Sequence, residues 1–337
     1  MRIRQSSVAL AQGTGLLLPL PVAAAPVISA AWVQAQFQRT DDGAGGRLQT
    51  LRRGLKFWVR CWWNERALAL STAAFRETEL DSITETAPEV ALRPLRSYLR
   101  RGLNPLRRAQ AVREHFGWLA QHVSMALIDR LYAGESAAVL DAGDTAAAGL
   151  SISLACASSL GREGEFALHL EWQGARVMSL AFSVLDASRV VSAADPAHAR
   201  GRRIVIGSLQ GVRGADAALR ELSGAAHRLR ASALLVLAAQ GLSAAWGLEA
   251  PLGVAAESHV YAGYASRRRK VAIDYDAAWQ EAGAERTGRH YWTLPRAPLL
   301  RPDSEVESRR RAQHRRRNTF RQNLLAAVRG RAEMLIA

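Results

Sequence analysis

The order of the fold is decided by residues 203–261, which read RIVIGSLQGVRGADAALRELSGAAHRLRASALLVLAAQGLSAAWGLEAPLGVAAESHVY. The segment 203–208 predicts a strand, and the pattern from about Asp216 to Trp246 predicts a long helical segment, with Gly224 and Gly241 as possible interruptions. Residues 231–239 are apolar on every side except at Ser232, so this helix is expected to be buried. A second strand is predicted at 252–261. Because a strand–helix–strand crossover suits parallel strands, we expect the two strands to be parallel neighbours or near neighbours in one sheet.

Upstream of this unit the sequence alternates with the period of a strand. Apolar and polar residues alternate along 166–172 and again along 178–184, and Gln173-Gly174 separates the two runs. This pattern predicts a β-hairpin with one buried face. Further upstream, Asn104-Pro105 is a suitable start for a helix whose apolar residues recur at three and four positions.

The predicted fold class is therefore α+β. A helical region comes first, then a mixed β-sheet with a buried central helix, then a basic C-terminal helix. The expected divisions of the chain are a variable extension (1–46), a helical region (47–140), an α/β core (150–300) and an arginine-rich helix (301–337). On the helix after Pro105, we expect His115 and His122 to be packing or surface residues, since they lack a carboxylate partner at metal-ligand spacing.

Composition describes a basic globular chain. The 337 residues are 49% hydrophobic and carry a formal net charge of +15, almost all of it from arginine. The charge favours partners with phosphate or carboxylate surfaces, such as nucleic acid, anionic lipid or lipopolysaccharide. The two cysteines, Cys61 and Cys156, do not have the spacing of a metal site. Two scattered cysteines indicate a reducing compartment, and one disulfide between them is the alternative. No apolar run outside the N-terminus is long enough to predict a transmembrane helix.

A basic amphipathic helix is predicted from Arg47 onward. Its apolar stripe consists of Leu48, Leu51, Leu55, Trp58, Val59 and Trp62. Arg52, Lys56 and Arg60 lie on the opposite side. One interpretation is a helix lying on an anionic membrane with its tryptophans at the interface. We expect the other, a stripe that faces the core, because long chains usually bury such stripes.

The C-terminal segment carries the densest positive charge. Ser304-x-x-Glu307 has the spacing of a capping box and predicts the start of a helix. The candidate anion-binding residues on that helix are Arg309, Arg310, Arg311, Arg315, Arg316 and Arg317. Phe320, Leu324 and Val328 then continue as an apolar stripe. Phosphate groups of lipid or nucleic acid are suitable ligands, and docking on an acidic patch of the same chain is an equal alternative. Nucleic acid is less favoured, because no aromatic residues interleave the arginines.

Two segments carry candidate chemistry. Gln210-Gly211-x-x-Gly214 lies where a strand leads into a helix, so its backbone N–H groups are candidates for binding a phosphate or pyrophosphate; the alternative is a plain turn. At the end of the second strand, Glu257, His259 and Tyr261 are expected to share one face. His259 is the candidate general base, Tyr261 the candidate acid and Asp274 a residue that orients them. The alternative is a hydrogen-bonded strand end followed by a solvated loop.

A set of short motifs follows in order along the chain between Leu51 and Phe320. They are LRRGL (99–103), REGEF (162–166), IGSLQG (206–211), HRLR (227–230), HVY (259–261), DYDAAW (274–279), LP (294–295) and RAQHRRR (311–317). In this order they resemble the VirK/YbjX family of Gram-negative bacterial proteins, a family of unknown function. The resemblance implies a role at the bacterial envelope, with virulence-associated surface phenotypes and resistance to host peptides. It implies no agreed catalytic residues.

Two functions remain open at this point. One is an accessory protein without catalysis that contacts anionic lipid, lipopolysaccharide or a surface protein. The other is an enzyme similar to the GNAT acyltransferases, in which a strand-to-helix turn holds the pyrophosphate of acyl-CoA; an acyl carrier is an alternative donor. Here Gln210, Gly211 and Gly214 would bind that donor. We expect the chain in the cytoplasm or peripheral at the inner membrane. Secretion is the alternative, because Arg2 and Arg4 precede an apolar stretch that Pro19, Pro21 and Pro26 interrupt.

Overall fold

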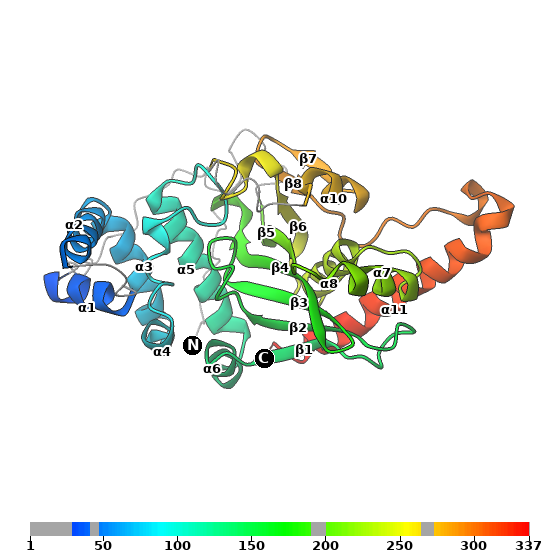
Figure 1. Ribbon diagram of the computed structural model, residues 1–337, viewed down its shortest axis with the longest axis horizontal. Coiled ribbons are helices and arrows are strands. Elements are labelled where there is room, and N and C mark those ends of the chain that lie inside the picture. The colour runs from blue at the N-terminus through cyan, green and yellow to red at the C-terminus, as the bar shows by residue number, and fades with distance from the viewer. Residues whose placement is uncertain (1–28, 41–46, 190–199, 264–272, 337) are drawn as a thin grey trace, which may run out of the picture.

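The computed structural model describes residues 29–40, 47–189, 200–263 and 273–336. Their strands form one eight-stranded sheet (Figure 1). The strands are β1 (Ser136–Leu140), β2 (Leu150–Cys156), β3 (Phe166–Trp172), β4 (Ala175–Asp186), β5 (Arg202–Gly211), β6 (Glu249–Val254), β7 (Glu285–Thr287) and β8 (Tyr291–Thr293). The helices are α1 (Ala30–Thr40), α2 (Arg47–Trp63), α3 (Glu65–Glu77), α4 (Asp81–Thr86), α5 (Pro105–His122), α6 (Met125–Tyr132), α7 (Asp216–Ala225), α8 (Ala231–Ala245), α10 (Tyr275–Glu281) and α11 (Arg311–Glu333).

The sheet has one parallel pair among the described strands. Its order is β1-β2-β3-β4-β5-β6-β8-β7, and only β5 and β6 run parallel. The predicted parallel pair is confirmed, and so is the hairpin, which is β3 and β4. Gln173 (φ 51°) and Gly174 (φ 78°) both take the left-handed conformation, which a two-residue hairpin turn of this twist requires.

The helices and the sheet share a hydrophobic core. Its residues run from Phe75 to Ala332. α5 packs against α3 and β4, and α8 packs against β4, β5 and β6. α11 lies along α8, and a Cβ atom on Gly241 would lie 2.6 Å from Val328 Cγ1, so a glycine is needed for this close approach. These contacts confirm the α+β class, the buried central helix and the C-terminal helix with its stripe.

The helical segment expected over 216–246 is two helices, and the break lies at neither Gly224 nor Gly241. α7 ends at Ala225 and α8 begins at Ala231. Between them His227 (φ 53°) and Arg228 (φ 66°) are both left-handed, which no helix tolerates. The Arg228 N–H turns back to the Ser223 carbonyl at 2.7 Å. The separation gives the buried helix its own N-terminus at Ala231.

The second strand of the crossover is shorter than predicted. β6 ends at Val254, and residues 256–258 form a 3₁₀ turn. Just beyond the end of the strand, the Ala255 N–H donates to the His290 carbonyl at 2.9 Å. Glu257, His259 and Tyr261 therefore do not share a strand face, and the expectation that they alternate on one strand is wrong.

The tail helix begins later than predicted. Ser304 belongs to a short 3₁₀ turn, α11 begins at Arg311, and its N-cap has no side-chain hydrogen bond. The capping box is therefore absent. Glu307 forms an ion pair with Arg309 at 2.8 Å instead. Its carboxylate is used by the arginine run rather than by a helix start.

The remaining expectations have mixed outcomes. His115 is buried and its Nδ1 accepts from the Val184 N–H at 3.2 Å, and His122 stacks on Trp118 with ring centroids 5.1 Å apart. Both are packing residues, as expected.

Cys61 and Cys156 are free thiols. No helix of the described residues is both long and apolar enough to cross a bilayer. The signal-like N-terminal stretch and the basic cluster 267–270 lie outside the described residues.

Candidate active site

The sheet opens between its two parallel strands. The last pair between β5 and β6 joins Ile206 to Gly253. β5 stays paired with β4 as far as Gly211. Residues 207–211 therefore continue along β4 while β6 has turned away. An opening of this kind leaves backbone groups of both strands without a strand partner, and other groups must satisfy them.

Two aromatic side chains of α10 fill that opening. The Tyr275 hydroxyl donates to the Leu209 carbonyl of β5 at 3.0 Å. The Trp279 indole N–H donates to the Val254 carbonyl of β6 at 2.9 Å. Both side chains are fully buried. α10 thus bridges the separated strands and fixes the position of the Tyr275 hydroxyl.

A loop before β3 is pressed against β5 at the same place. The β4–β5 register shifts at Gly207, which makes this glycine the extra residue of a β-bulge. A Cβ atom on Gly207 would lie 1.8 Å from the Glu163 carbonyl oxygen. A Cβ atom on Gly164 would lie 2.5 Å from the Phe182 backbone. The two glycines therefore let the loop approach the sheet and hold Glu163 beside the opening.

A polar cluster lies there. It consists of the buried Glu163, His259 and Tyr275 and the half-buried Gln210. Gln210 Nε2 donates to Glu163 Oε1 at 2.9 Å, and the same oxygen lies 4.0 Å from His259 Nε2. The His259 ring stacks on Tyr275 with centroids 4.9 Å apart, and its Nε2 lies 3.4 Å from the Tyr275 hydroxyl. Glu163 Oε2 has no hydrogen-bond partner among the described residues.

Burial sets the protonation of this cluster. It raises the pKa of Glu163 from 4.5 to about 7, because the charged carboxylate loses its hydration. It lowers the pKa of His259 from 6.5 to about 4 for the same reason. Near neutral pH the histidine is therefore neutral, and the carboxyl group is the member of the pair that gains or loses a proton.

A cavity of about 570 Å³ borders this cluster. His259, Tyr261 and Asp274 all line it, together with Tyr275 and Arg101. The structure thus brings the three predicted catalytic residues together. Asp274 also has a local task, since it is the N-cap of α10 and its Oδ1 accepts from the Ala277 N–H at 3.1 Å.

A second cavity of about 350 Å³ adjoins the first. Ile273 and Asp274 line both of them. The second cavity is also lined by Arg230, Ala231 and Ser232, the N-terminus of α8. No side chain caps that terminus. The first backbone N–H groups of α8 point toward this end of the helix, which borders the cavity, and an anion is favoured there.

The predicted donor-binding residues have different positions from those expected. Gln210 and Gly211 belong to β5 rather than to a turn. Gly214 (φ 82°) lies in the turn before α7, whose first turn carries the acidic Asp216. None of the three predicted donor-binding residues lines the two cavities. The helix start beside the cavities is that of α8.

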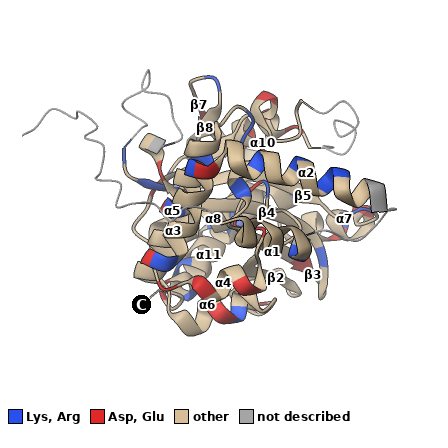
Figure 2. Cartoon of the chain, turned by 90° about the vertical axis from the view of Figure 1, so that its left-hand side faces the viewer, with Lys and Arg blue, Asp and Glu red and all other residues tan. Residues whose placement is uncertain are grey.

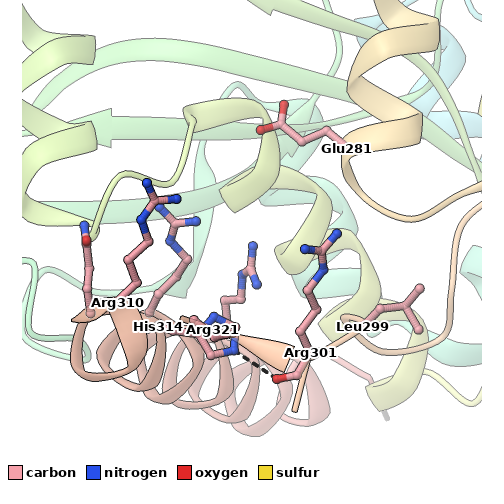
Figure 3. Close-up of a pocket in the computed structure, with 9 residues that line it drawn as sticks. Glu281, Leu299, Arg301, Arg310, His314 and Arg321 are labelled. Carbon is pink, nitrogen blue, oxygen red and sulfur yellow. Dashed lines mark hydrogen bonds between the residues drawn. The ribbon is translucent and has the colours of Figure 1, made fainter. Parts of the chain in front are cut away.

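The tail arginines spread around α11. Arg310 and Arg317 line a hollow of about 530 Å³ with Arg301 and Arg321 (Figure 3). In Figure 3 the arginine side chains rise from α11 and the preceding linker toward Glu281 of α10. Arg315 and Arg316 line a separate small pocket beside His227 and Phe320, whereas Arg309 pairs with Glu307 and the Arg311 Nε–H donates to the Val306 carbonyl.

Sequence reasoning missed two members of the cluster. Glu163 belongs to REGEF, a stretch that reads as charged surface, and Tyr275 belongs to DYDAAW, which reads as a helix start. The available signal was a pair of glycines: Gly164 stands between two glutamates just before a strand, and Gly207 interrupts the apolar strand that begins at 203. Glycine at such positions marks a close backbone approach or a bulge.

Fold and site together define an α+β protein with a polar cavity at the divergence of its one parallel strand pair, within the described residues. The chain belongs to the family described as Protein of unknown function (DUF535), whose model matches residues 46–329. That family includes VirK/YbjX, so the resemblance read from the ordered segments is confirmed. No curated protein matches the chain, and no solved structure does.

Proposed function

We propose that the chain transfers an acyl group from an acyl thioester, such as acyl-CoA or an acyl carrier, to an amine at the cavity between β5 and β6. The observation that carries the proposal is the joining of two features. A buried cluster with a carboxyl group of pKa about 7 borders one cavity. The adjoining cavity lies at the uncapped N-terminus of the crossover helix α8.

In this proposal the donor's phosphates lie at the N-terminus of α8. Phosphate oxygens accept hydrogen bonds from the free N–H groups near Ala231 and Ser232 and interact favourably with the helix dipole. Arg230 lines the same cavity, and its guanidinium forms an ion pair with Glu281 at 3.1 Å. This replaces the glycine turn at Gln210–Gly214 as the place for the donor. The thioester then reaches the first cavity, where the acceptor enters beside His259 and Tyr261.

The chemical step needs only proton management. The amine nitrogen attacks the thioester carbon, its C–N bond forms, and the C–S bond breaks. The amine's proton passes by way of His259 to the ionised Glu163, whose Oε1 lies 4.0 Å from His259 Nε2. It returns to the sulfur, which leaves as a free thiol. Because the carboxyl must be ionised to accept the proton, the rate rises with pH through about 7.

A charge placed at the start of α8 tests this proposal. Ser232→Asp adds an acidic residue at the second helical position, where it stabilises the helix but repels a phosphate. Ser82→Asp is the matched control, since Ser82 is the exposed second residue of α4. We expect acetyl-CoA to raise the melting temperature of the native protein and of S82D, and not that of S232D. A native protein with no thermal shift, no calorimetric heat and no thiol release with acyl-CoAs of several lengths contradicts the proposal.

A second function, accessory contact with the anionic surface of the bacterial envelope, is favoured by charge. The net charge is +15, and the cationic hollow along α11 collects four arginines. The two functions are compatible, since an acyltransferase can work at a membrane surface. Binding of the native protein to anionic vesicles that weakens with added salt supports the second function; absence of binding at low ionic strength argues against it.

A further inference from the structure

α2 packs against the rest of the protein through an unexpected side. That side consists of Gly54, Phe57 and Cys61, which are less exposed than the leucines beside them. The ring of Phe57 lies 5.8 Å from that of Phe37 in α1, centroid to centroid. A Cβ atom on Gly54 would lie 3.5 Å from the same Phe37 ring. Cys61 is buried in a small cluster with Leu68 of α3.

The longer apolar stripe of α2 therefore faces outward, and the expectation that it faces the core is wrong. Its exposed members are Leu51 (70%), Leu55 (65%), Trp58 (48%) and Trp62 (66%), and Trp63 is 78% exposed beside them. Positions i, i+4, i+7 and i+11 of a helix lie on one face, so the four form a continuous apolar ridge. Exposed large apolar residues gathered in one patch mark a contact surface.

A basic row begins beside this ridge. Arg52, Lys56 and Arg60 follow one another at i, i+4 and i+8, and α2 contains no acidic residue. With about 3.6 residues per turn, the row starts near Leu55 at Arg52 and ends across the helix from the ridge at Arg60. Figure 2 shows blue bands along α2, and red segments lie on α4 and α6 below it. In Figure 1, α2 lies at the opposite end of the molecule from the start of α11.

The ridge continues into a hollow at the end of α2. A cavity of about 890 Å³ lies between Trp62, Trp63 and the start of α5, where Leu106 is 47% exposed. The surface thus combines tryptophans, an apolar hollow and a basic border. Tryptophan prefers the level of lipid headgroups, and basic residues beside an apolar helix face attract anionic lipids.

We propose that α2 is a membrane-surface anchor that lies flat on an anionic phospholipid bilayer, with Leu51, Leu55, Trp58 and Trp62 in the headgroup–acyl boundary. The basic row contacts lipid phosphates from the side. This proposal does not depend on acyl transfer. It favours the membrane interpretation of the helix from Arg47 over a membrane contact through the arginines of α11, which begins at the other end of the molecule.

Charge separates this occupant from two others. A second copy docked ridge to ridge would bring two basic rows close together, which costs free energy. The chain's own residues 1–28 contain two arginines and no acidic residue, so they offer no complement to the basic row. An anionic bilayer complements both the ridge and the row.

The test uses the full chain and vesicles of phosphatidylcholine alone or mixed equally with phosphatidylglycerol. We expect the native protein to sediment at least about tenfold more strongly with the mixed vesicles at low salt. Lys56→Gln/Arg60→Gln is expected to weaken binding about 30-fold, because each basic residue near such a surface contributes about a fivefold factor. Leu55→Ser/Trp62→Ser is expected to abolish binding at the same lipid concentration. Unchanged melting curves check that the variants are folded.

Matched substitutions at distant exposed sites serve as controls. Leu299→Ser/Met334→Ser and Arg220→Gln/Arg329→Gln change apolar and basic residues that are likewise exposed but lie away from α2, and both should bind like the native protein. Three results overturn the proposal: no preference for anionic vesicles, undiminished binding by the Leu55/Trp62 variant, or a dimer in solution that this variant dissolves. Binding that appears only after residues 1–28 are removed also overturns it, since the chain then covers its own ridge.

Discussion

Replacing Glu163 by glutamine should change how folding stability depends on pH. The pKa of this carboxyl is about 7 in the folded protein against 4.5 as its ordinary value, because burial disfavours the charged form. Each pKa unit corresponds to about 1.36 kcal/mol, so the difference amounts to roughly 3 kcal/mol. The substitution Glu163→Gln is an apt probe, since the amide oxygen it introduces keeps the acceptor for the Gln210 side chain, which donates at 2.9 Å.

The sign follows from proton binding. Below about pH 4.5 the group is neutral in both states and contributes nothing to the difference. Between about 4.5 and 7 the unfolded chain ionises first, so the folded state binds more protons and native stability falls as pH rises. Above about 7 the full cost of roughly 3 kcal/mol remains. The variant lacks this titration, and any cost of its unpaired amide is the same at every pH.

The assay is urea unfolding followed by tryptophan fluorescence, for native protein and E163Q, from about pH 4.5 to about pH 8. We expect the free energy of unfolding of the native protein, relative to the variant, to fall by about 3 kcal/mol across this range. A difference that stays constant within about 0.5 kcal/mol, or that grows with pH, refutes the burial argument. The proposed chemistry adds that E163Q loses acyl transfer while it gains relative stability at about pH 8.

A neighbouring glutamate provides the matched control. Glu165 is also fully buried, but it accepts two hydrogen bonds from Arg93 at 3.0 and 3.2 Å. Glu165→Gln leaves the guanidinium without its counter-charge, and removing one partner of a buried pair typically costs about 3–5 kcal/mol. E165Q should therefore destabilise at about pH 8, where E163Q is relieved. Equal effects of the two substitutions would falsify the assignment of different roles to the two carboxyls.

Three further outcomes are expected. Tyr275→Phe removes the hydroxyl that satisfies a carbonyl of the opened strand, and calorimetric or urea unfolding should show a loss of about 1–3 kcal/mol; no loss means that water replaces the hydroxyl. Gly207→Ala should fail to fold or should melt at a far lower temperature, because the new Cβ atom would lie 1.8 Å from a backbone oxygen. Gly211→Ala should fold normally, because nothing lies within 4 Å of its new Cβ atom. Equal melting temperatures of the two variants contradict the bulge. Burial raises the pKa values of the Cys61 and Cys156 thiols to about 11 and about 12. Both should therefore react slowly with a thiol reagent at about pH 8 until urea is added. Rapid labelling of the native protein contradicts their burial.

The sequence predicted those parts of the fold that follow from the periodicity and turn residues of a single segment. The hairpin followed from alternation and from Gln173-Gly174, and the parallel pair followed from the strand–helix–strand order. The break between α7 and α8 did not, because His227 and Arg228 take left-handed conformations that glycine or asparagine usually signal. Alanines and leucines on both sides of the break continue the helical pattern, so periodicity alone joins the two helices.

The direction in which a helix face points is a different kind of information. The periodicity of α2 showed a stripe of leucines and tryptophans, but a second, shorter line through Phe57 and Cys61 is the one that packs. Which line is buried depends on the partner surface, and that surface comes from residues such as Val33 and Leu92. A single helix sequence does not contain that choice.

The candidate site was predictable only where it is local. His259, Tyr261 and Asp274 are close in sequence and follow the same strand, so their meeting around one cavity could be anticipated. Glu163 lies in the loop before β3, and it reaches His259 because β3 and β4 place that loop beside β5. A carboxyl that reads as surface charge becomes a fully buried member of the cluster through sheet order alone.

The physical cost of that position is itself an argument about function. The fold needs two glycines, Gly164 and Gly207, to bring the loop this close. It then holds Glu163 with one oxygen that lacks a hydrogen-bond partner among the described residues, and with a pKa that opposes folding at neutral pH. A leucine in its place would pack without this cost, whereas Glu165, two residues on, is compensated by Arg93. Strongly shifted groups that lack such compensation are concentrated at functional sites, and the partners of Glu163, His259 and Tyr275, line a cavity. Glu163 is therefore where loss of activity and gain of stability should coincide.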